Sequence, residues 1–381
     1  MKKLALVFIV IVLALAVFAV SKQSAFADTQ SDLQQEVENG LNNIDFSQME
    51  NVSTPFFQNF VEKVRQIING EFDSTQSFWE LFCELLGSNF SAILPQLISI
   101  FCILVVCGLV RNTSDGFVSV DTSNVISFVG ITVVSISVLA LVVEAYRQVS
   151  AMISQTAALT DAAMPILLTL VTANGGNVSS SVCQPAMVMF SSVVVGTVKN
   201  VLLPLSVFGM AFVVVSNISS NLRVEKLSGL MNSASSWMLG VMFTLFSAFT
   251  AVQGITASSI DGVSFRAAKF AAKNYIPILG GYVSDGFDIV VASTSLIKNA
   301  FGAVSMLLMF FIAAKPLVTL ICVNLGLQAV SAISEPIVES KYLKILGGIC
   351  KSLTFLSALV FAVAFMFCIL TFIAISCANL V

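Results

Sequence analysis

Residues 301–333 read FGAVSMLLMFFIAAKPLVTLICVNLGLQAVSAI, an apolar run in which Lys315 carries the charge. A helix of about 20 apolar residues is enough to cross the hydrocarbon core of a bilayer. At about 33 residues, this run is too long for one simple span and too short for two full spans with a loop. The run therefore predicts membrane-embedded helix with an interruption inside it.

Lys315 and Pro316 mark the expected place of that interruption. Proline lacks a backbone donor and disfavours helix at the preceding residue, so the break should fall at Lys315. A lysine at the bilayer centre costs on the order of 3 kcal/mol unless it faces a wet cavity, an acidic partner or a helix-end carbonyl. This makes Lys315 a candidate functional residue. The alternative is a tight hairpin turn from which the lysine reaches the surface.

The rest of the chain repeats this apolar character. Of the 381 residues, 57% are hydrophobic and only 10% are charged, whereas about a quarter of the residues in soluble domains are charged. We therefore expect an all-α, polytopic membrane protein with about six spans, embedded in the lipid bilayer over residues 90–381. Besides the quoted run, the predicted spans are residues 90–110, 125–143, 201–216, 237–252 and 352–378.

The N-terminus has the three parts of a secretory signal peptide within residues 1–27. A lysine pair precedes an apolar run, and Ala25 and Ala27 mark a cleavage site. An uncleaved anchor helix is the alternative, because the run is at the short end of what spans a bilayer. Residues 28–89 then form a small helical segment outside the cytoplasm, and because this segment is acidic we expect no nucleic-acid partner.

Two segments between the predicted spans are interrupted by proline and glycine. Residues 144–200 contain Pro165 and Pro185, and residues 255–299 contain Pro277; each also contains a glycine pair. Irregular backbone at membrane depth is tolerated where protein or a water-filled cavity surrounds it. We expect re-entrant or interfacial segments here. The two also share short matches, such as Val198-Lys199-Asn200 with Ile297-Lys298-Asn299, which raises the alternative of an internal repeat.

Basic residues give an expected orientation for the first half of the chain. With the N-terminal segment outside, the loops after residues 110, 216 and 333 lie inside, where basic residues are preferred. Arg111, Arg223 and Lys341 agree with this arrangement. Basic residues between 266 and 298 would lie outside, so the topology of residues 144–200 and 254–300 stays open.

Arg266, Lys269 and Lys273 form the other candidate functional group. Their spacings of three and four place them on one face of a helix. Bases beside a small-residue surface in a membrane helix can line a pathway or a helix contact. The alternative is that these side chains extend to lipid headgroups.

The residues needed for common enzyme classes are missing from the sequence. Histidine is absent, as are the HExxH, Walker A and GxSxG patterns. The eight cysteines lie mostly in apolar segments and do not form a disulfide framework. We therefore expect no enzyme activity, no catalytic residues, no metal and no cofactor.

Residues 254–302 read GITASSIDGVSFRAAKFAAKNYIPILGGYVSDGFDIVVASTSLIKNAFG and are the most distinctive part of the chain. The turn at Asp261, the basic helix with Arg266 and Lys269, and the pairs Ile276-Pro277 and Ser284-Asp285 resemble the stage III sporulation protein AE family of endospore-forming Firmicutes. The signal peptide, acidic segment and hydropathy profile are also similar to that family.

The resemblance implies a function that the residues alone do not. It implies a membrane subunit of a channel, or feeding tube, that joins the mother cell to the forespore and is needed for spore development. The expected partners are other sporulation channel proteins in an oligomeric complex, and the expected location is the mother-cell membrane facing the forespore. A secondary transporter or permease is the alternative, because discontinuous helices and a repeat are typical of transporters.

Overall fold

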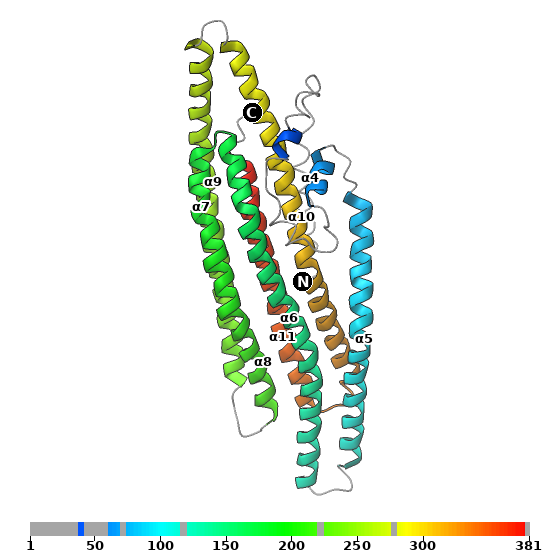
Figure 1. The fold of residues 1–381 in the computed structure, drawn as a ribbon. Coiled ribbons are helices and arrows are strands. Elements are labelled where there is room, and N and C mark those ends of the chain that lie inside the picture. Colours follow the sequence, from blue (N-terminus) through cyan, green and yellow to red (C-terminus); the bar gives the residue numbers. More distant parts are fainter. Residues whose placement is uncertain are drawn as a thin grey trace.

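The computed structural model describes residues 37–41, 60–68, 74–114, 120–218, 225–275 and 280–377. Its long helices run side by side in one elongated bundle (Figure 1). In chain order the helices are α4 (Phe60–Ile68), α5 (Ser74–Ser114), α6 (Val120–Ala173), α7 (Asn177–Val188), α8 (Leu203–Ile218), α9 (Glu225–Tyr275), α10 (Gly280–Ser334) and α11 (Ser340–Ser376). The π-helical turns η2 (Met189–Val195) and η3 (Val198–Leu202) join α7 and α8 into one rod.

The predicted fold class is confirmed. Within the described residues, six helices are long and apolar enough to cross a membrane, which agrees with about six expected spans in an all-α protein. The chain is thus a multi-pass membrane protein. The apolar stretches are Gly87–Val110, Val125–Ala173, Gln184–Asn217, Lys226–Val252, Asp288–Ser334 and Ser340–Ser376.

The direction of the chain alternates from helix to helix (Figure 1). The chain passes from α5 to α6, from α8 to α9 and from α10 to α11 at one end of the bundle, which we call the lower end. It passes from α6 to α7 and from α9 to α10 at the opposite, upper end, near which α4 also lies. The loops after residues 110, 216 and 333, which we expect on one side of the membrane, therefore share one end of the bundle.

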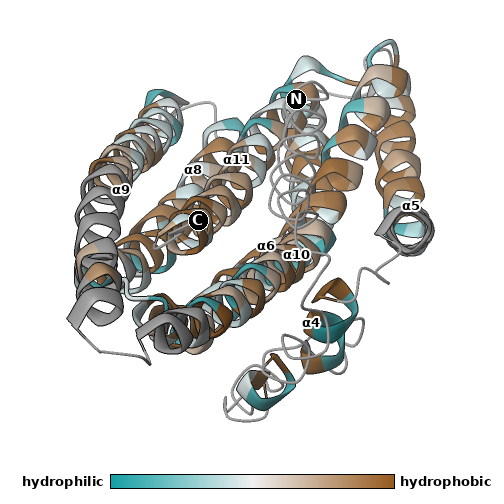
Figure 2. Cartoon of the chain, turned by 90° about the horizontal axis from the view of Figure 1, so that it is seen from above, coloured by the Kyte–Doolittle hydropathy of each residue, from teal (hydrophilic) through white to brown (hydrophobic). Residues whose placement is uncertain are grey.

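The N-terminal region is only partly described. The predicted signal peptide lies outside the described residues. Helix α4 is amphipathic, with a hydrophilic and a hydrophobic side (Figure 2); its Val64 is fully buried, and the helix packs against α10. Arg65 of α4 pairs with Glu38 at 3.4 Å. Helix α5 runs without a break from Ser74, within the predicted extracytoplasmic segment, through the first span.

The predicted interruptions of the helices at proline are wrong. Helix α6 continues through Pro165, and α10 continues through Pro316. A proline removes one backbone hydrogen bond and disfavours helix locally, but neighbouring helices hold the chain straight on both sides of it. The segments expected to be re-entrant are therefore parts of long helices within the described residues. Pro277 itself lies outside them.

The glycine pair after α6 does end a helix. Gly175 has a φ of 82°, a left-handed conformation that glycine adopts without steric cost. The Gly176 amide donates to the Val171 carbonyl and the Gly175 amide to the Thr172 carbonyl, both at 2.9 Å. These are the two hydrogen bonds of a Schellman cap. The cap reverses the chain so that α7 returns beside α6.

Helix α11 is the centre of the bundle. It packs against α6, α8, α9 and α10, and most of its side chains are buried, including Leu356, Val363 and Phe367.

A glycine allows close approach between α5 and the turn that joins α10 to α11. A Cβ on Gly108 of α5 would lie 2.6 Å from the carbonyl oxygen of Ile337 in that turn. Small residues at such points allow helices to contact neighbouring backbone.

Replacing Gly108 with leucine should therefore destabilise the protein by about 1–3 kcal/mol, because α5 or the turn must move. The measurement is the thermal unfolding midpoint of the purified protein in detergent. Gly240→Leu is the matched control, since nothing lies within 4 Å of a Cβ at this α9 position. Equal midpoints for the two variants would contradict the close packing at Gly108.

Candidate functional site: the seam between α6 and the π-helical segment

A π-helical segment interrupts the rod between α7 and α8. It consists of η2 and η3, which follow Pro185 of α7 by about one turn. Proline deprives a helix of one backbone hydrogen bond, and a wider turn is one way in which the helix adjusts to that loss. π-helical turns are rare in proteins and frequently occur at functional sites. This segment is therefore a candidate site on the outer surface of the bundle.

Two hydrogen bonds connect this segment to α6. Ser191 Oγ of η2 donates to Asp161 Oδ1 at 2.9 Å. Lys199 Nζ of η3 donates to Ser154 Oγ at 3.2 Å. Both pairs are exposed on the surface of the bundle. We call these four residues the seam; they place an acid and a base on a surface that lipid chains would not solvate.

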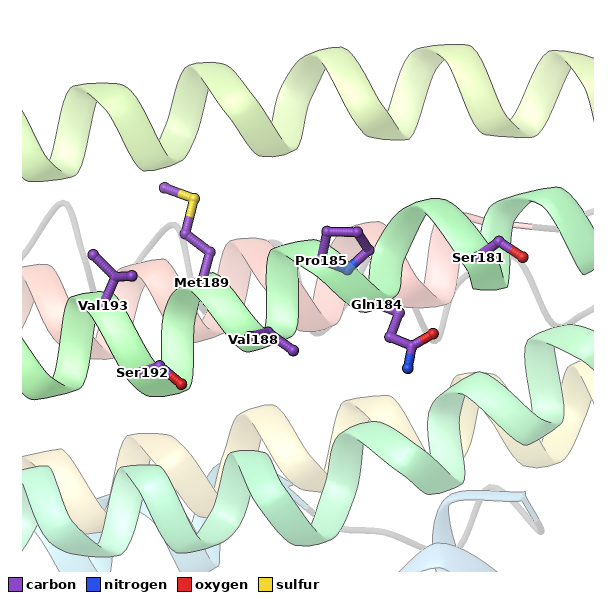
Figure 3. Close-up of a pocket in the computed structure, with 7 residues that line it drawn as sticks. All are labelled: Ser181, Gln184, Pro185, Val188, Met189, Ser192 and Val193. Carbon is purple, nitrogen blue, oxygen red and sulfur yellow. The ribbon is translucent and has the colours of Figure 1, made fainter.

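A shallow hollow of about 450 Å³ lies beside the seam. Figure 3 shows that Gln184 and Ser192 point toward α6, whereas Met189 points toward α9. The lining residues are Ser181, Gln184, Pro185, Val188, Met189, Ser192 and Val193. They all come from the single α7–η2 segment, so the hollow is open on the surface and does not enclose a small molecule as a substrate pocket would.

A second polar feature is buried near the upper end. Lys298 of α10 is 0% exposed, and its Nζ donates to the Cys377 carbonyl at 2.6 Å. The last carbonyls of a helix have no partner within that helix, and a cation near them also interacts favourably with the helix dipole. Lys298 therefore ties α10 to the C-terminal end of α11.

Next to it, the turn after α6 is also anchored on α10. Asn174 is 0% exposed, and its Nδ2 donates to Ser295 Oγ at 3.1 Å. A buried amide contributes to stability through such a bond, because it would otherwise lose hydration without compensation. The upper end of the bundle is thus held together by polar contacts between α6, α10 and α11.

The structure separates the predicted candidate residues from the seam. Lys315 is exposed and lies on uninterrupted α10, so it is neither at a helix break nor in a hairpin turn. Arg266, Lys269 and Lys273 lie on α9, beyond the apolar stretch that ends at Val252. Their side chains lie outside the described part of the structure.

Sequence reasoning missed the role of Lys298 and the seam. Lys199 and Lys298 occupy the same position in the two similar tripeptides, yet Lys199 is exposed and Lys298 is fully buried. Nothing local distinguishes them. The signal that could have found the seam is the spacing of polar residues in α6, where Ser154 and Asp161 are about two turns apart and so share a face.

Comparison with known proteins identifies the family. A family model described as stage III sporulation protein AE matches residues 58–378. The chain belongs to this family. Stage III sporulation protein AE of Bacillus subtilis (strain 168) is 28% identical over 219 residues, which are 58% of this chain and 55% of the relative. The match thus spans little more than half of the curated relative. No solved structure matches the chain.

Membership in the stage III sporulation protein AE family gives the chain a role in sporulation. The family match covers α4 and all the long helices of the bundle, including both sides of the seam. It therefore confirms the resemblance that residues 254–302 indicated.

Proposed function

We propose that this chain is a membrane subunit of the sporulation channel complex that links the mother cell and the forespore. In this proposal the chain lies in the mother-cell membrane that faces the forespore, with its N-terminal segment outside the cytoplasm. Its partners are other sporulation channel proteins in an oligomeric complex.

The seam is the structural observation that supports the proposal, in addition to family membership. Its Asp161 and Lys199 lie on the outer surface of the bundle, where lipid chains would leave both charges poorly solvated. They need water or another protein against them. A subunit of an assembly provides such an environment, whereas a bundle surrounded by lipid alone does not.

The structure offers less to the transporter alternative. A transporter binds its solute near the bilayer midplane, between helices that are broken there. In the described residues, the helices run through Pro165 and Pro316 unbroken. The hollow beside the seam is lined by one segment alone. These features favour a structural subunit.

Affinity purification from sporulating cells tests the proposal. We expect the tagged chain to retain other sporulation membrane proteins in mild detergent. The triple variant Arg266→Gln, Lys269→Gln and Lys273→Gln should lower this recovery several-fold, because in this proposal the basic face of α9, which lies beyond the apolar stretch, binds acidic partners.

Lys315→Gln is the matched control for that experiment, since Lys315 is an exposed lysine on another helix. It should retain partner proteins at the native level. If the native chain is recovered alone, and reconstituted chain moves a solute across vesicles, the channel-subunit proposal fails in favour of the transporter.

A further inference from the structure

The long helices exceed the thickness of a membrane. Helices α6 and α10 have 54 and 55 residues, or about 80 Å each at 1.5 Å per residue. The hydrocarbon core of a bilayer is about 30 Å thick, and membrane helices tilt by up to about 40°. No tilt in that range brings 80 Å of helix within the bilayer. The bilayer therefore covers only part of the bundle.

The exposed side chains of α6 divide this helix into two parts. In its lower part the exposed large side chains are apolar: Val125, Phe128, Val129, Val133, Ile136 and Val143. Above Val143 the exposed large apolar side chains of α6 end. The exposed positions that follow are mainly charged, polar or small: Glu144, Arg147, Ser154, Gln155, Ala158, Asp161 and Thr169. A lipid-facing surface would continue the apolar pattern.

Charged residues mark the upper and lower ends of this apolar part. On α10, Lys315 and Glu335 are exposed and the chain between them carries no charge. On α6 the chain carries no charge between Asp121 and Glu144. Each of these stretches has about 20 residues, or about 30 Å of helix, which matches the hydrocarbon thickness.

Contacts between helices show that the upper borders lie near one level. Thr156 Oγ1 of α6 donates to Met309 Sδ of α10 at 3.6 Å, and Arg147 of α6 and Lys315 of α10 both lie about two turns below this contact. Lys315 and Arg147 thus bound the apolar part on two different helices. Lys199 of η3 reaches Ser154, about two turns above Arg147 on α6.

The lower border is also set by a contact. Ser127 Oγ of α6 donates to Glu339 Oε2, just before α11, at 3.1 Å. From Ser127 to Arg147 is about 30 Å of helix. Between the borders, Trp237 of α9 is 73% exposed, as expected for a tryptophan that faces lipid or its interface.

From these observations we propose that the bilayer surrounds only the lower half of the bundle, from the level of Glu339 to that of Arg147 and Lys315. The upper half stands in water as a helical projection of about 40 Å. Lipid chains contact the exposed apolar side chains of the lower half. The seam lies on the projection, where water or another subunit can contact it. The body of the protein is then part membrane anchor and part extramembrane domain. Its apolar composition alone would assign all of it to the membrane.

The α6 side of the upper half is built like the surface of a water-soluble bundle. Helix α11, which is the most apolar of these helices, is buried at its centre, and α6 contributes buried residues such as Leu159 and Leu167 on its inner face. The outer face of α6 is polar or small. An apolar inside and a polar outside are what a helix in water requires.

Thiol labelling at two positions of α6 tests the placement. Ala140 and Ala158 are both exposed, and about five turns of helix place them on the same face, about 27 Å apart. Each is replaced by cysteine in the full chain, expressed alone in a host that does not sporulate. Open membrane fragments, accessible from both sides, are treated with a charged maleimide, and label gained over the native chain is measured.

Ala158→Cys should react at least ten-fold faster than Ala140→Cys, because the reactive thiolate forms in water and not in hydrocarbon. Both should react equally after unfolding in SDS. A third site, Ala267→Cys, is exposed on α9 beyond Val252 and should react like Ala158→Cys.

Protection of both upper sites would overturn the proposal, since the upper half would then lie in lipid. Rapid labelling of Ala140→Cys would also overturn it, because the lower half would then line an aqueous path. The experiment uses no sporulation partner, so its result is independent of the proposed channel function.

Discussion

A clean deletion of this gene should abolish spore formation while vegetative growth continues at the native rate. The expectation rests on membership in the stage III sporulation protein AE family and on the proposal that no other protein replaces this subunit. The measurement is the count of heat-resistant spores, which should fall by several orders of magnitude, together with growth curves in rich medium.

Complementation makes the deletion experiment specific. The native chain supplied elsewhere on the chromosome should restore sporulation, and Lys315→Leu should restore it as well, because Lys315 is exposed and α10 continues through it. A vegetative growth defect, or normal spore counts in the deletion strain, would contradict a dedicated sporulation role. Failure of Lys315→Leu at normal protein level would show instead that the charge of Lys315 is needed.

Lys298→Glu should destabilise the protein by about 3–5 kcal/mol, the cost typical of an uncompensated buried charge. Lys298 is fully buried and donates to the Cys377 carbonyl. A carboxylate in its place would meet the negative end of the α11 dipole and would have no proton to donate to that carbonyl. Accumulation in membranes and the thermal unfolding midpoint in detergent should both fall.

Lys199→Glu is the matched control, because Lys199 occupies the corresponding tripeptide position but is exposed. It loses one surface hydrogen bond to Ser154, and exposed interactions of this kind contribute about 1 kcal/mol or less. Its accumulation should stay close to the native level. If Lys298→Glu accumulates as well as Lys199→Glu, the buried contact with Cys377 is not a determinant of stability.

Apolar runs allowed the helical class and about six spans to be predicted, because a stretch of this length and composition has no other stable place than a membrane or a core. The alternation of six spans also predicted that the loops after residues 110, 216 and 333 share one end of the bundle. The predicted breaks at Pro165 and Pro316 are wrong, because the local cost of a proline is not enough to end a helix in this bundle. In the bundle, α6 and α10 each pack against several neighbouring helices, and one lost hydrogen bond does not break them.

The candidate functional residues likewise divide into those that the sequence identified and those that only the structure distinguishes. The sequence identified Lys315 by its apolar surroundings, and Arg266, Lys269 and Lys273 by their spacing. The sequence could not distinguish Lys199 from Lys298, whose neighbours in the chain are alike, because the burial of each residue depends on which helix packs against it. Only the arrangement in space shows that Lys298 meets the end of α11 whereas Lys199 meets Ser154 at the surface.

The amino-acid sequence is enough to show that this chain is a helical membrane protein and to indicate its family, since the first follows from composition and the second from residues close together in the chain. The tertiary structure decided where helices continue, which polar groups are buried and which face of α6 is exposed. These depend on contacts between residues far apart in the sequence, such as Lys298 with Cys377. Apolar residues alone mark what avoids water, and packing decides whether lipid or protein covers them.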